Sequence, residues 1–458
     1  MDNTMALAGK FSKQRRILII VENLPVPFDR RVWNEATTLV KAGYEVSVIC
    51  PTGHGADARR EIIDGIHVYR HPLIEARRMH LYFVEYSVAL FWEFLLAWRV
   101  YFERGFDVIH ACNPPDLIFL IGGFFKLFLG KKFVFDHHDI NPELFEAKFG
   151  KRNFLYRVVA ALERWTFAVA DVSIATNNSY RTIALERGRM RPDRVFVVRS
   201  GPNLERLRIV PPDPSLKKGR AYCVGYVGVL GAQEGLKYLL EAARYIVHVL
   251  GRHDVQFCIA GGGPELERLK ALSIELNVAD YVTFAGRIAD AELLKILNTA
   301  DVCVNPDECN AMNDKSTMNK IMEYMALGKP IVQFDLTEGK FTAQDASLYA
   351  KSNDPIDFAD KIIDLLGDPE RRKRLGEFGR TRVLEDLAWP HEAPKLLRAY
   401  QTLFEEGLRD DARSTRSRTV GRLFDLSTRD SRRRAQVRHA RADVTKHAAK
   451  EATTTDTA

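Results

Sequence analysis

The sequence predicts an α/β protein made of two doubly wound, Rossmann-like halves. Short apolar runs alternate with amphipathic helical stretches along residues 15–407, which is the pattern of βαβ units on a parallel sheet. The alternation is interrupted at Pro202–Lys218, a segment with four prolines and no periodicity, and then starts again. We therefore expect one sheet before this segment and a second sheet after it.

The first half opens with a buried strand at Ile17–Val21 and a helix from about Asp29 to Ala42. The loop between them lacks the G-x-G-x-x-G of dinucleotide-binding folds, which argues against a dehydrogenase. Because the loop follows the carboxyl end of a strand, it is either a plain connection or the lining of a crevice. Further strands are expected at 45–50, 66–70, 107–110, 132–136, 172–175 and 195–198, and helices at 79–104, 114–129, 153–170 and 178–187.

The second half repeats the alternation. Strands are expected at 222–228, 255–260, 281–284, 300–304, 331–334 and 347–350, and helices at 236–250, 265–276, 290–298, 355–366, 369–386 and 389–405, with one more between the fourth and fifth strands. The predicted boundaries are a loose N-terminus 1–14, a first domain 15–205, a hinge 206–220, a second domain 221–386, a C-terminal helix 387–407 and a basic, disordered tail 408–458.

The net charge of +7 comes from the end of the chain. Residues 409–450 hold 13 Lys and Arg against 5 Asp and Glu, so the remainder is nearly neutral. A nearly neutral body argues against nucleic acid as a partner. The tail lacks large apolar residues and cannot bury a core. It is either a basic arm for an anionic membrane or nucleic acid, or a solubilising tail.

The six cysteines form no CxxC pair, which indicates reduced thiols in a cytoplasmic protein. The set Cys303, Asp307 and Cys309 is too weak a pattern for us to predict a metal site. No secretory signal is visible, because the first apolar run is only five residues long. Leu81–Phe102 is the most apolar long stretch, but Glu85, Glu93 and Arg99 interrupt it, so no membrane span is expected.

Two expected helices are rich in aromatic residues. Leu81–Phe102 contains Phe, Trp and Tyr, and Leu117–Leu129 contains four Phe with lysines beside them. Aromatic residues with lysines at one edge suit a membrane interface, so peripheral contact with the inner face of an anionic membrane is one interpretation. A thick helical layer over a sheet explains the same composition.

The segment Asn313–Phe334 contains the clearest candidate site. Its apolar residues recur at the spacing of one helix face: Met318, Ile321, Met322 and Met325. Gly328 fits the position after the helix end. Asn319, Lys320 and Glu323 face away from the apolar stripe, near a helix N-terminus that suits a phosphate. An ordinary surface pair of Lys320 and Glu323 explains the same pattern.

With these features in view, the chain resembles family 4 of the glycosyltransferases, which have the GT-B fold of two Rossmann-like domains facing a cleft. The resemblance covers residues 15–407 and rests on the order of several motifs. These motifs are RRVWNEATTLVKAGYEVSVIC, HHDINPE, VVRSGPNLERL, GGGPELERL, VTFAGR, ADVCVNP and KIMEYMALGKPIV.

The resemblance implies that the second domain binds a UDP- or GDP-sugar and that the first domain receives a polysaccharide or lipid-linked acceptor. It implies transfer with retention of configuration, no metal and no cofactor beyond the nucleotide-sugar co-substrate. Glu323 matches the second glutamate of the family's E-x7-E motif and is expected to bind the ribose. The first glutamate is replaced by Lys315, so this chain is similar to a subgroup without the complete motif. The backbone amides that meet sugar and phosphate fall near Met318 and Asn319.

The family's diphosphate-binding Arg and Lys are also missing, because their positions hold Val229 and Glu234. Since two phosphates need neutralising and a helix dipole gives only about half a charge, we hypothesise that Lys320 and Lys315 supply the missing charge.

His138 matches the family's histidine at a strand end, near the point where acceptor and leaving group meet. It is the expected catalytic residue, with His137 as an adjacent candidate and a structural, loop-capping role as the alternative. Arg287, Gly262 and Gly263 fall where the family's loops hold the base and ribose.

Two other functions fit the same fold. A nucleotide-sugar epimerase would consume donor without an acceptor. A catalytically silent binding subunit would explain Lys315 and the missing Arg/Lys pair.

Overall fold

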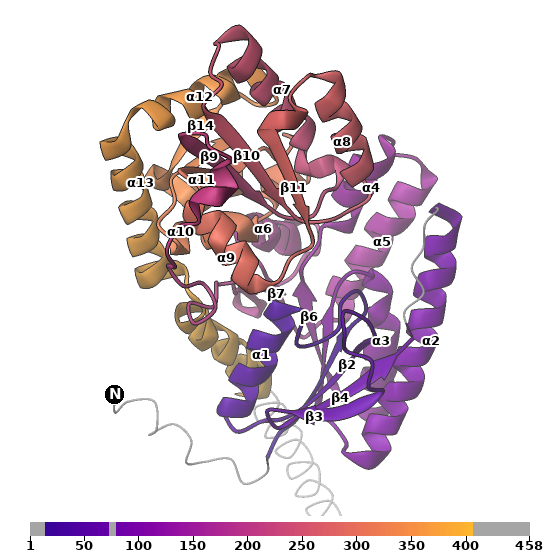
Figure 1. The fold of residues 1–458 in the computed structure, drawn as a ribbon. Coiled ribbons are helices and arrows are strands. Elements are labelled where there is room, and N and C mark those ends of the chain that lie inside the picture. Colours follow the sequence, from indigo (N-terminus) through magenta and orange to yellow (C-terminus); the bar gives the residue numbers. More distant parts are fainter. Residues whose placement is uncertain (1–13, 73–78, 406–458) are drawn as a thin grey trace, which may run out of the picture. The chain divides into compact units, whose positions relative to one another are not determined.

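The computed structural model describes residues 14–72 and 79–405, with the backbone alone for residues 79–84. These residues form helices around two sheets whose strands are almost all parallel, which confirms the predicted fold class (Figure 1). Nearly all of the predicted loose N-terminus and the predicted tail of residues 408–458 lie outside the described residues. The exact domain boundaries stay a prediction.

The first sheet contains β1 (Arg16–Val21), β2 (Glu45–Pro51), β3 (Arg60–Ile63), β4 (Ile66–His71), β5 (Val108–Cys112), β6 (Lys132–His137), β7 (Val172–Ala175) and β8 (Val195–Val197). Its helices are α1 (Arg30–Lys41), α2 (Met79–Glu103), α3 (Phe119–Leu129), α4 (Asn141–Phe149), α5 (Phe154–Val169) and α6 (Asn178–Glu186). The strand order is β3-β4-β2-β1-β5-β6-β7-β8, and β3 pairs antiparallel with β4.

The second sheet contains β9 (Tyr222–Val227), β10 (Val255–Ala260), β11 (Val282–Gly286), β12 (Val302–Asn305), β13 (Ile331–Phe334) and β14 (Ser347–Ala350). Its helices are α7 (Leu236–Arg244), α8 (Leu266–Glu275), α9 (Asp290–Thr299), α10 (Asn319–Ala326), α11 (Thr337–Ala343), α12 (Pro355–Gly367) and α13 (Pro369–Arg382), and residues 389–405 are also helical. The strand order is β11-β10-β9-β12-β13-β14.

Both strand orders reverse direction beside the first strand of the sheet. The reversal lies between β1 and β5 in the first sheet and between β9 and β12 in the second. In open parallel sheets, ligands bind outside the carboxyl ends of the strands at such a reversal, because the loops leave in opposite directions and open a crevice. The loops after β1, β5, β9 and β12 are therefore where a site is expected.

The strands are buried because apolar helices cover the sheets. On the second sheet one apolar cluster joins α7 and α12 to the strands, and another joins α9 and α10 to them. On the first sheet the cluster includes side chains of α2, α3, α5 and α6. Within the described residues, no helix has both the length and the apolar character needed to cross a membrane.

Three elements were not predicted from the sequence. Strand β3 is a short edge strand whose alternate side chains are exposed, so its pattern is half polar. Helix α4 extends the HHDINPE segment and starts with Pro142 in its first turn, after which Gly150 ends it in a left-handed conformation. Helix α11 is only seven residues long. None of the three offers a long apolar period.

Candidate functional site

Helix α10 begins shortly after β12, at the reversal of the second sheet. The predicted apolar face is buried, since Ile321, Met322 and Met325 are 0% exposed. Met318 precedes the helix in an extended conformation, and its side chain makes no capping hydrogen bond. Asn319, the first helical residue, is exposed. The first backbone N–H groups of α10 therefore lack a side-chain cap and suit an anionic ligand.

Glu323 lies one turn further along α10, with 16% of its side chain exposed. Its Oε1 accepts hydrogen bonds from Arg206 and, at 3.2 Å, from Arg30. Both arginines also pair with Asp290, at 3.1 Å for Arg30 and 3.2 Å for Arg206. Arg30 is the first residue of α1, and Arg206 belongs to the chain segment that connects β8 to β9. Glu323, the predicted ribose ligand, is therefore contacted by two other parts of the chain.

Lys320 turns inward instead of sharing the polar face of Asn319 and Glu323, which corrects the predicted arrangement. Its side chain is 9% exposed, and its ammonium donates hydrogen bonds of 2.6 Å to Asp307 and Glu234. Burial alone would raise the pKa of Glu234, but Lys320 holds it below its ordinary value. Burial raises the pKa of Asp307 to about 7. The charge of Lys320 is thus compensated within the protein, and its role at a diphosphate stays a prediction.

Lys315 points towards the first half of the chain. Its Nζ lies 3.3 Å from Oε1 of Glu143 on α4. The side chain of Asn177, which caps α6, donates hydrogen bonds to the Lys315 carbonyl (2.8 Å) and to Thr317 Oγ1 (3.0 Å). The segment around Lys315, which stands where the family has its first glutamate, is therefore held to the first half by an ion pair and two hydrogen bonds. A contact between Lys315 and a diphosphate stays a prediction.

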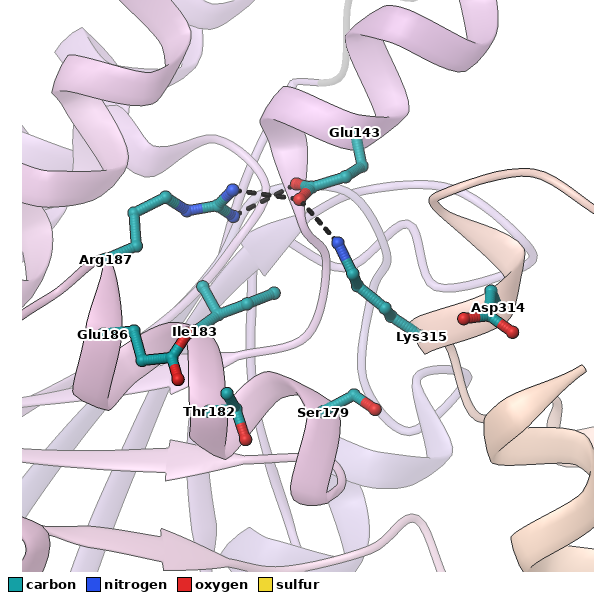
Figure 2. A pocket seen from close by; sticks show the side chains of 8 residues that line it. All are labelled: Glu143, Ser179, Thr182, Ile183, Glu186, Arg187, Asp314 and Lys315. Carbon is teal, nitrogen blue, oxygen red and sulfur yellow. Dashed lines mark hydrogen bonds and ion pairs between the residues drawn. The ribbon is translucent and has the colours of Figure 1, made fainter.

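A pocket of about 380 Å³ lies beside this contact (Figure 2). Figure 2 shows the carboxylate of Glu143 between Arg187, at 2.9 Å, and Lys315. The lining residues are Glu143, Ser179, Thr182, Ile183, Glu186, Arg187, Asp314 and Lys315. Charges of both signs and two hydroxyl groups suit a polar ligand more than an apolar one.

Gly262 and Gly263 follow β10, where the sequence predicted contacts to base and ribose. A Cβ on Gly263 would lie 2.6 Å from the carbonyl oxygen of Leu230, so this loop packs against the loop after β9 at a distance that only glycine allows. Arg287 lies beside Gly262, and its Nη1 is 3.3 Å from Nδ1 of His54. The structure brings these predicted residues together at one edge of the second sheet, and their contacts to a nucleotide stay a prediction.

His138 directly follows β6 and is 14% exposed. Its Nε2 lies 2.5 Å from Oδ2 of Asp136, and its backbone N–H donates to Asn113 at 2.7 Å. His137 is 0% exposed and faces Glu163 at 3.6 Å. The structure therefore leaves His138 the better placed of the two to meet a ligand.

Asp136 fixes the proton on His138. Burial alone would raise the pKa of Asp136, but Arg31 and His138 hold it well below its ordinary value. It is therefore a carboxylate, and it accepts from Arg31 Nη2 at 2.7 Å and Arg31 Nε at 3.1 Å. Because a carboxylate only accepts, Nε2 of His138 carries a proton, although Arg31 Nε also lies 2.9 Å from it. The other ring nitrogen, Nδ1, is then the one available to a ligand.

A second layer of ionisable groups lies behind Asp136. The ligand-type atoms of Glu35, His110, Cys112 and Asp136 are all buried and lie within 4.8 Å of one another. The guanidinium of Arg31 is 3.1 Å from Glu35 and supplies positive charge to this group. Burial raises the pKa of Glu35 well above its ordinary value and lowers the pKa of His110. This cluster was not predicted from the sequence, where only Cys303, Asp307 and Cys309 stood out as possible metal ligands.

Sequence reasoning also missed the arginines that hold the site residues. Arg31 and Glu35 are four residues apart on the buried face of α1, together with Val32 and Ala36. Charged residues on a buried helix face are rare unless they are paired, so this spacing was a usable signal. Arg206 lies in the VVRSGPNLERL motif, and nothing in the sequence distinguishes it from an ordinary surface arginine.

Two parallel α/β halves, each with polar residues at its strand reversal, define a two-domain protein of the GT-B class. The family model described as Glycosyltransferase Family 4 matches residues 29–206, and the model described as Glycosyl transferases group 1 matches residues 221–368. Together these two models span most of the described chain, which therefore belongs to the family 4 glycosyltransferases with a GT-B fold.

Individual relatives agree with this assignment. D-inositol 3-phosphate glycosyltransferase of Corynebacterium jeikeium is 30% identical over 42% of this chain and 46% of its own length. Alpha-maltose-1-phosphate synthase of Mycolicibacterium smegmatis is 25% identical over 62% of this chain and 76% of its own. The chain thus spans about half of the first relative. The structure of sucrose-phosphate synthase from Thermosynechococcus elongatus has a TM-score of 0.70 at 19% identity, over 86% of this chain and 100% of that one.

Proposed function

We propose that the protein transfers a sugar from a UDP- or GDP-sugar to a polysaccharide or lipid-linked acceptor, with retention of configuration. The observation that supports this most directly is the uncapped N-terminus of α10, with Glu323 one turn further on, at the strand reversal of the second sheet. A free helix N-terminus suits the donor's phosphates, and a carboxylate one turn away suits the ribose hydroxyls. The two sequence relatives named above are named as a glycosyltransferase and as a sugar-phosphate synthase, which favours transfer over the epimerase and silent-subunit hypotheses.

The donor site comprises Met318, Asn319 and Glu323 on one side and the loop residues Gly262, Gly263 and Arg287 on the other. Backbone N–H groups of α10 bind the phosphates, and Glu323 accepts hydrogen bonds from the ribose. Lys320 and Lys315 act from behind, through the ion pairs that position α10 and the segment before it.

The acceptor hydroxyl approaches from the first half, near His138. Its oxygen forms a bond to the anomeric carbon as the bond from that carbon to the diphosphate breaks, and its proton passes to the departing diphosphate on the same face. His138, whose Nε2 is fixed by Asp136, presents Nδ1 to the donor sugar and stabilises the charge that develops there. The reaction needs no metal and no cofactor other than the nucleotide sugar.

A donor panel tests this proposal. Purified protein is incubated with single UDP- and GDP-sugars, with and without a membrane extract as acceptor, and released nucleotide is measured. Acceptor-dependent release from one donor supports transfer. Loss of a donor without acceptor would indicate an epimerase, and no heat in calorimetric titration with any donor would indicate a silent subunit. His138→Ala should lower the turnover number about 100-fold or more while leaving donor binding nearly unchanged.

We also propose that the enzyme works at the inner face of a membrane, in contact with anionic lipid. Large apolar side chains are exposed on three helices of the first half, and we call this set the aromatic face. It comprises Phe91, Trp92, Leu95 and Phe102 on α2, Leu120, Leu127 and Phe128 on α3, and Phe154, Leu155, Val158 and Trp165 on α5.

The three helices that carry the aromatic face pack against one another. Trp98 of α2 meets Phe124 of α3 at 5.9 Å between ring centroids, and Phe119 of α3 meets Trp165 of α5 at 6.2 Å. Exposed Arg157 and Arg164 lie on α5 beside it. A solvated helical layer would not expose this many large apolar groups together, whereas an interface with acyl chains and anionic headgroups would use both features.

Sedimentation with vesicles tests the membrane contact. Wild-type protein should sediment with vesicles that contain phosphatidylglycerol and less with pure phosphatidylcholine. The double substitution Leu127→Ser and Phe128→Ser should reduce this binding, whereas Ile274→Ser, which changes an apolar residue that is 67% exposed in the second half, should not. Equal binding by both variants would contradict the proposal.

A further inference from the structure

The proposed donor carries two negative charges on its diphosphate, and the lysines predicted to neutralise them, Lys320 and Lys315, both pair with carboxylates of the protein. The loop after β9 holds Val229 and Glu234 where the family has its cations. Lys320 is compensated by Asp307 and Glu234, each at 2.6 Å. The N-terminus of α10 adds only about half a charge. Another source of positive charge is therefore needed for tight binding of a nucleoside diphosphate.

Two arginines meet at the carboxylate predicted to hold the ribose. Arg206 is 16% exposed and Arg30 is 52% exposed, and both donate to Oε1 of Glu323. The Nε of Arg206 is buried and has no hydrogen-bond partner among the described residues. Both also pair with Asp290, which is 48% exposed. These four side chains are neutral together, and the two guanidinium groups still have unused N–H donors.

The position of the arginines on α10 brings them near the expected phosphates. Glu323 is four residues after Asn319, so it lies about 6 Å along the helix axis from the first helical residue. A guanidinium bound to Glu323 is therefore about one helical turn from the free N–H groups. Arginine side chains are long enough to cover that distance by rotation, and their planar donors match phosphate oxygens.

We propose that Arg30 and Arg206 are the diphosphate ligands of this enzyme, an inference that rests on the proposed function. Without donor, Glu323 holds both guanidinium groups. When donor binds, the ribose hydroxyls donate hydrogen bonds to Glu323 in place of the arginines, and the arginines donate to the phosphates instead. The two guanidinium groups rotate towards the phosphates, so that two positive charges face two negative charges. Because Arg30 belongs to the first half, donor binding also draws on both halves of the chain.

Calorimetric titration with nucleosides and nucleoside diphosphates tests this exchange. Wild type, Arg30→Ala, Arg206→Ala and the double variant are each titrated with UDP, uridine, GDP and guanosine. Charge-assisted hydrogen bonds to phosphate predict that the double variant binds the nucleoside diphosphate about 10- to 100-fold more weakly. Binding of the nucleoside, which has no phosphate, should be unchanged or tighter, because Glu323 is released. Arg30→Lys and Arg206→Lys should recover part of the loss.

Arg191→Ala is the matched control, because Arg191 is 71% exposed and pairs only locally with Asp193 at 2.7 Å among the described residues. It should bind all four ligands like wild type. If the variants bound the nucleoside and the nucleoside diphosphate equally more weakly than wild type, the arginines would have a structural role or would position the ribose. If the variants bound both ligands more tightly, the arginines would only compete with the ribose for Glu323. Either result overturns the inference, as does unchanged diphosphate binding in the double variant. If wild type bound no nucleotide at all, the proposed function itself would fail.

A folding control accompanies the titrations, since Arg206 is mostly buried. The urea midpoint of each variant is measured first. Arg30→Ala, which changes a half-exposed side chain, carries the test alone if Arg206→Ala does not fold, with an expected loss of about threefold to tenfold for the diphosphate only.

Discussion

Each half of the molecule buries a basic side chain between two carboxyl groups, directly behind a predicted site residue. The arginine triad of the first half consists of Arg31, Asp136 and Glu35. The lysine triad of the second half consists of Lys320, Glu234 and Asp307. The arginine triad contacts His138, and the lysine triad lies under the first turn of α10. The two triads are alike in composition but differ in how firmly their charge is set.

In the arginine triad the pKa values of the two carboxyl groups are shifted in opposite directions. The pKa of Asp136 is held well below its ordinary value and that of Glu35 is raised well above it, chiefly by burial. In the lysine triad burial raises the pKa of Asp307 only to about 7. The lysine triad, which lies beside the proposed donor site, can therefore change its charge near neutral pH.

The largest effect should follow from breaking the arginine triad. Arg31→Ala leaves the Asp136 carboxylate buried without its main partner, so we expect the free energy of unfolding to fall by about 3–5 kcal/mol. Urea unfolding followed by circular dichroism measures this change.

The chain offers a matched control one residue away. Arg30 has the same charge and also pairs with acidic groups, but its side chain is 52% exposed. Arg30→Ala should therefore change the unfolding free energy by less than about 1 kcal/mol. If Arg30→Ala and Arg31→Ala lowered the unfolding free energy by similar amounts, burial would not explain the difference expected between these two ion pairs.

Breaking the lysine triad should have a smaller effect. Lys320→Ala also removes a buried cation and, at pH 6 where Asp307 is largely protonated, leaves one uncompensated carboxylate on Glu234, but Glu234 is 17% exposed whereas Asp136 is 0% exposed. We expect a loss of about 2–3 kcal/mol in unfolding free energy at pH 6. Lys340→Ala, which breaks an exposed pair with Asp335, is the control. A loss larger than that of Arg31→Ala would reverse the ranking of the two triads.

The fold followed from the sequence because βαβ periodicity is local, and α10 was found because its apolar residues recur every turn. The partners of the site residues were not found, because they are distant in sequence. Glu323 is held by Arg30, 293 positions away, and Lys320 turned inward because Asp307 and Glu234 lie beneath it. Helical period alone cannot tell a lysine on the solvent face from one at the edge of a buried carboxylate pair.

The adjustable charge of the lysine triad predicts a pH-dependent donor affinity. As pH rises through about 7, Asp307 loses its proton and the triad changes from neutral to a net charge of −1. A negative charge near the N-terminus of α10 opposes an anionic diphosphate, so affinity for UDP or GDP should fall about threefold to tenfold between pH 6 and pH 8. Calorimetry at both pH values measures it. Asp307→Asn should remove this dependence, and a dependence that survives in Asp307→Asn would place the titrating group elsewhere.

The smallest effect should follow from restoring the family's missing glutamate. Lys315→Glu completes the E-x7-E motif in sequence, but Lys315 faces Glu143 of the first half, and its backbone is fastened to Asn177. The new carboxylate would meet Glu143 as a like charge, so we expect unfolding free energy to fall by no more than about 1 kcal/mol and donor affinity to stay within about twofold. Lys315→Gln, which removes charge without adding repulsion, separates the two contributions. If Lys315→Glu instead tightened donor binding tenfold, this segment would reach the donor as the motif implies, and the contact with Glu143 would be one that donor binding breaks.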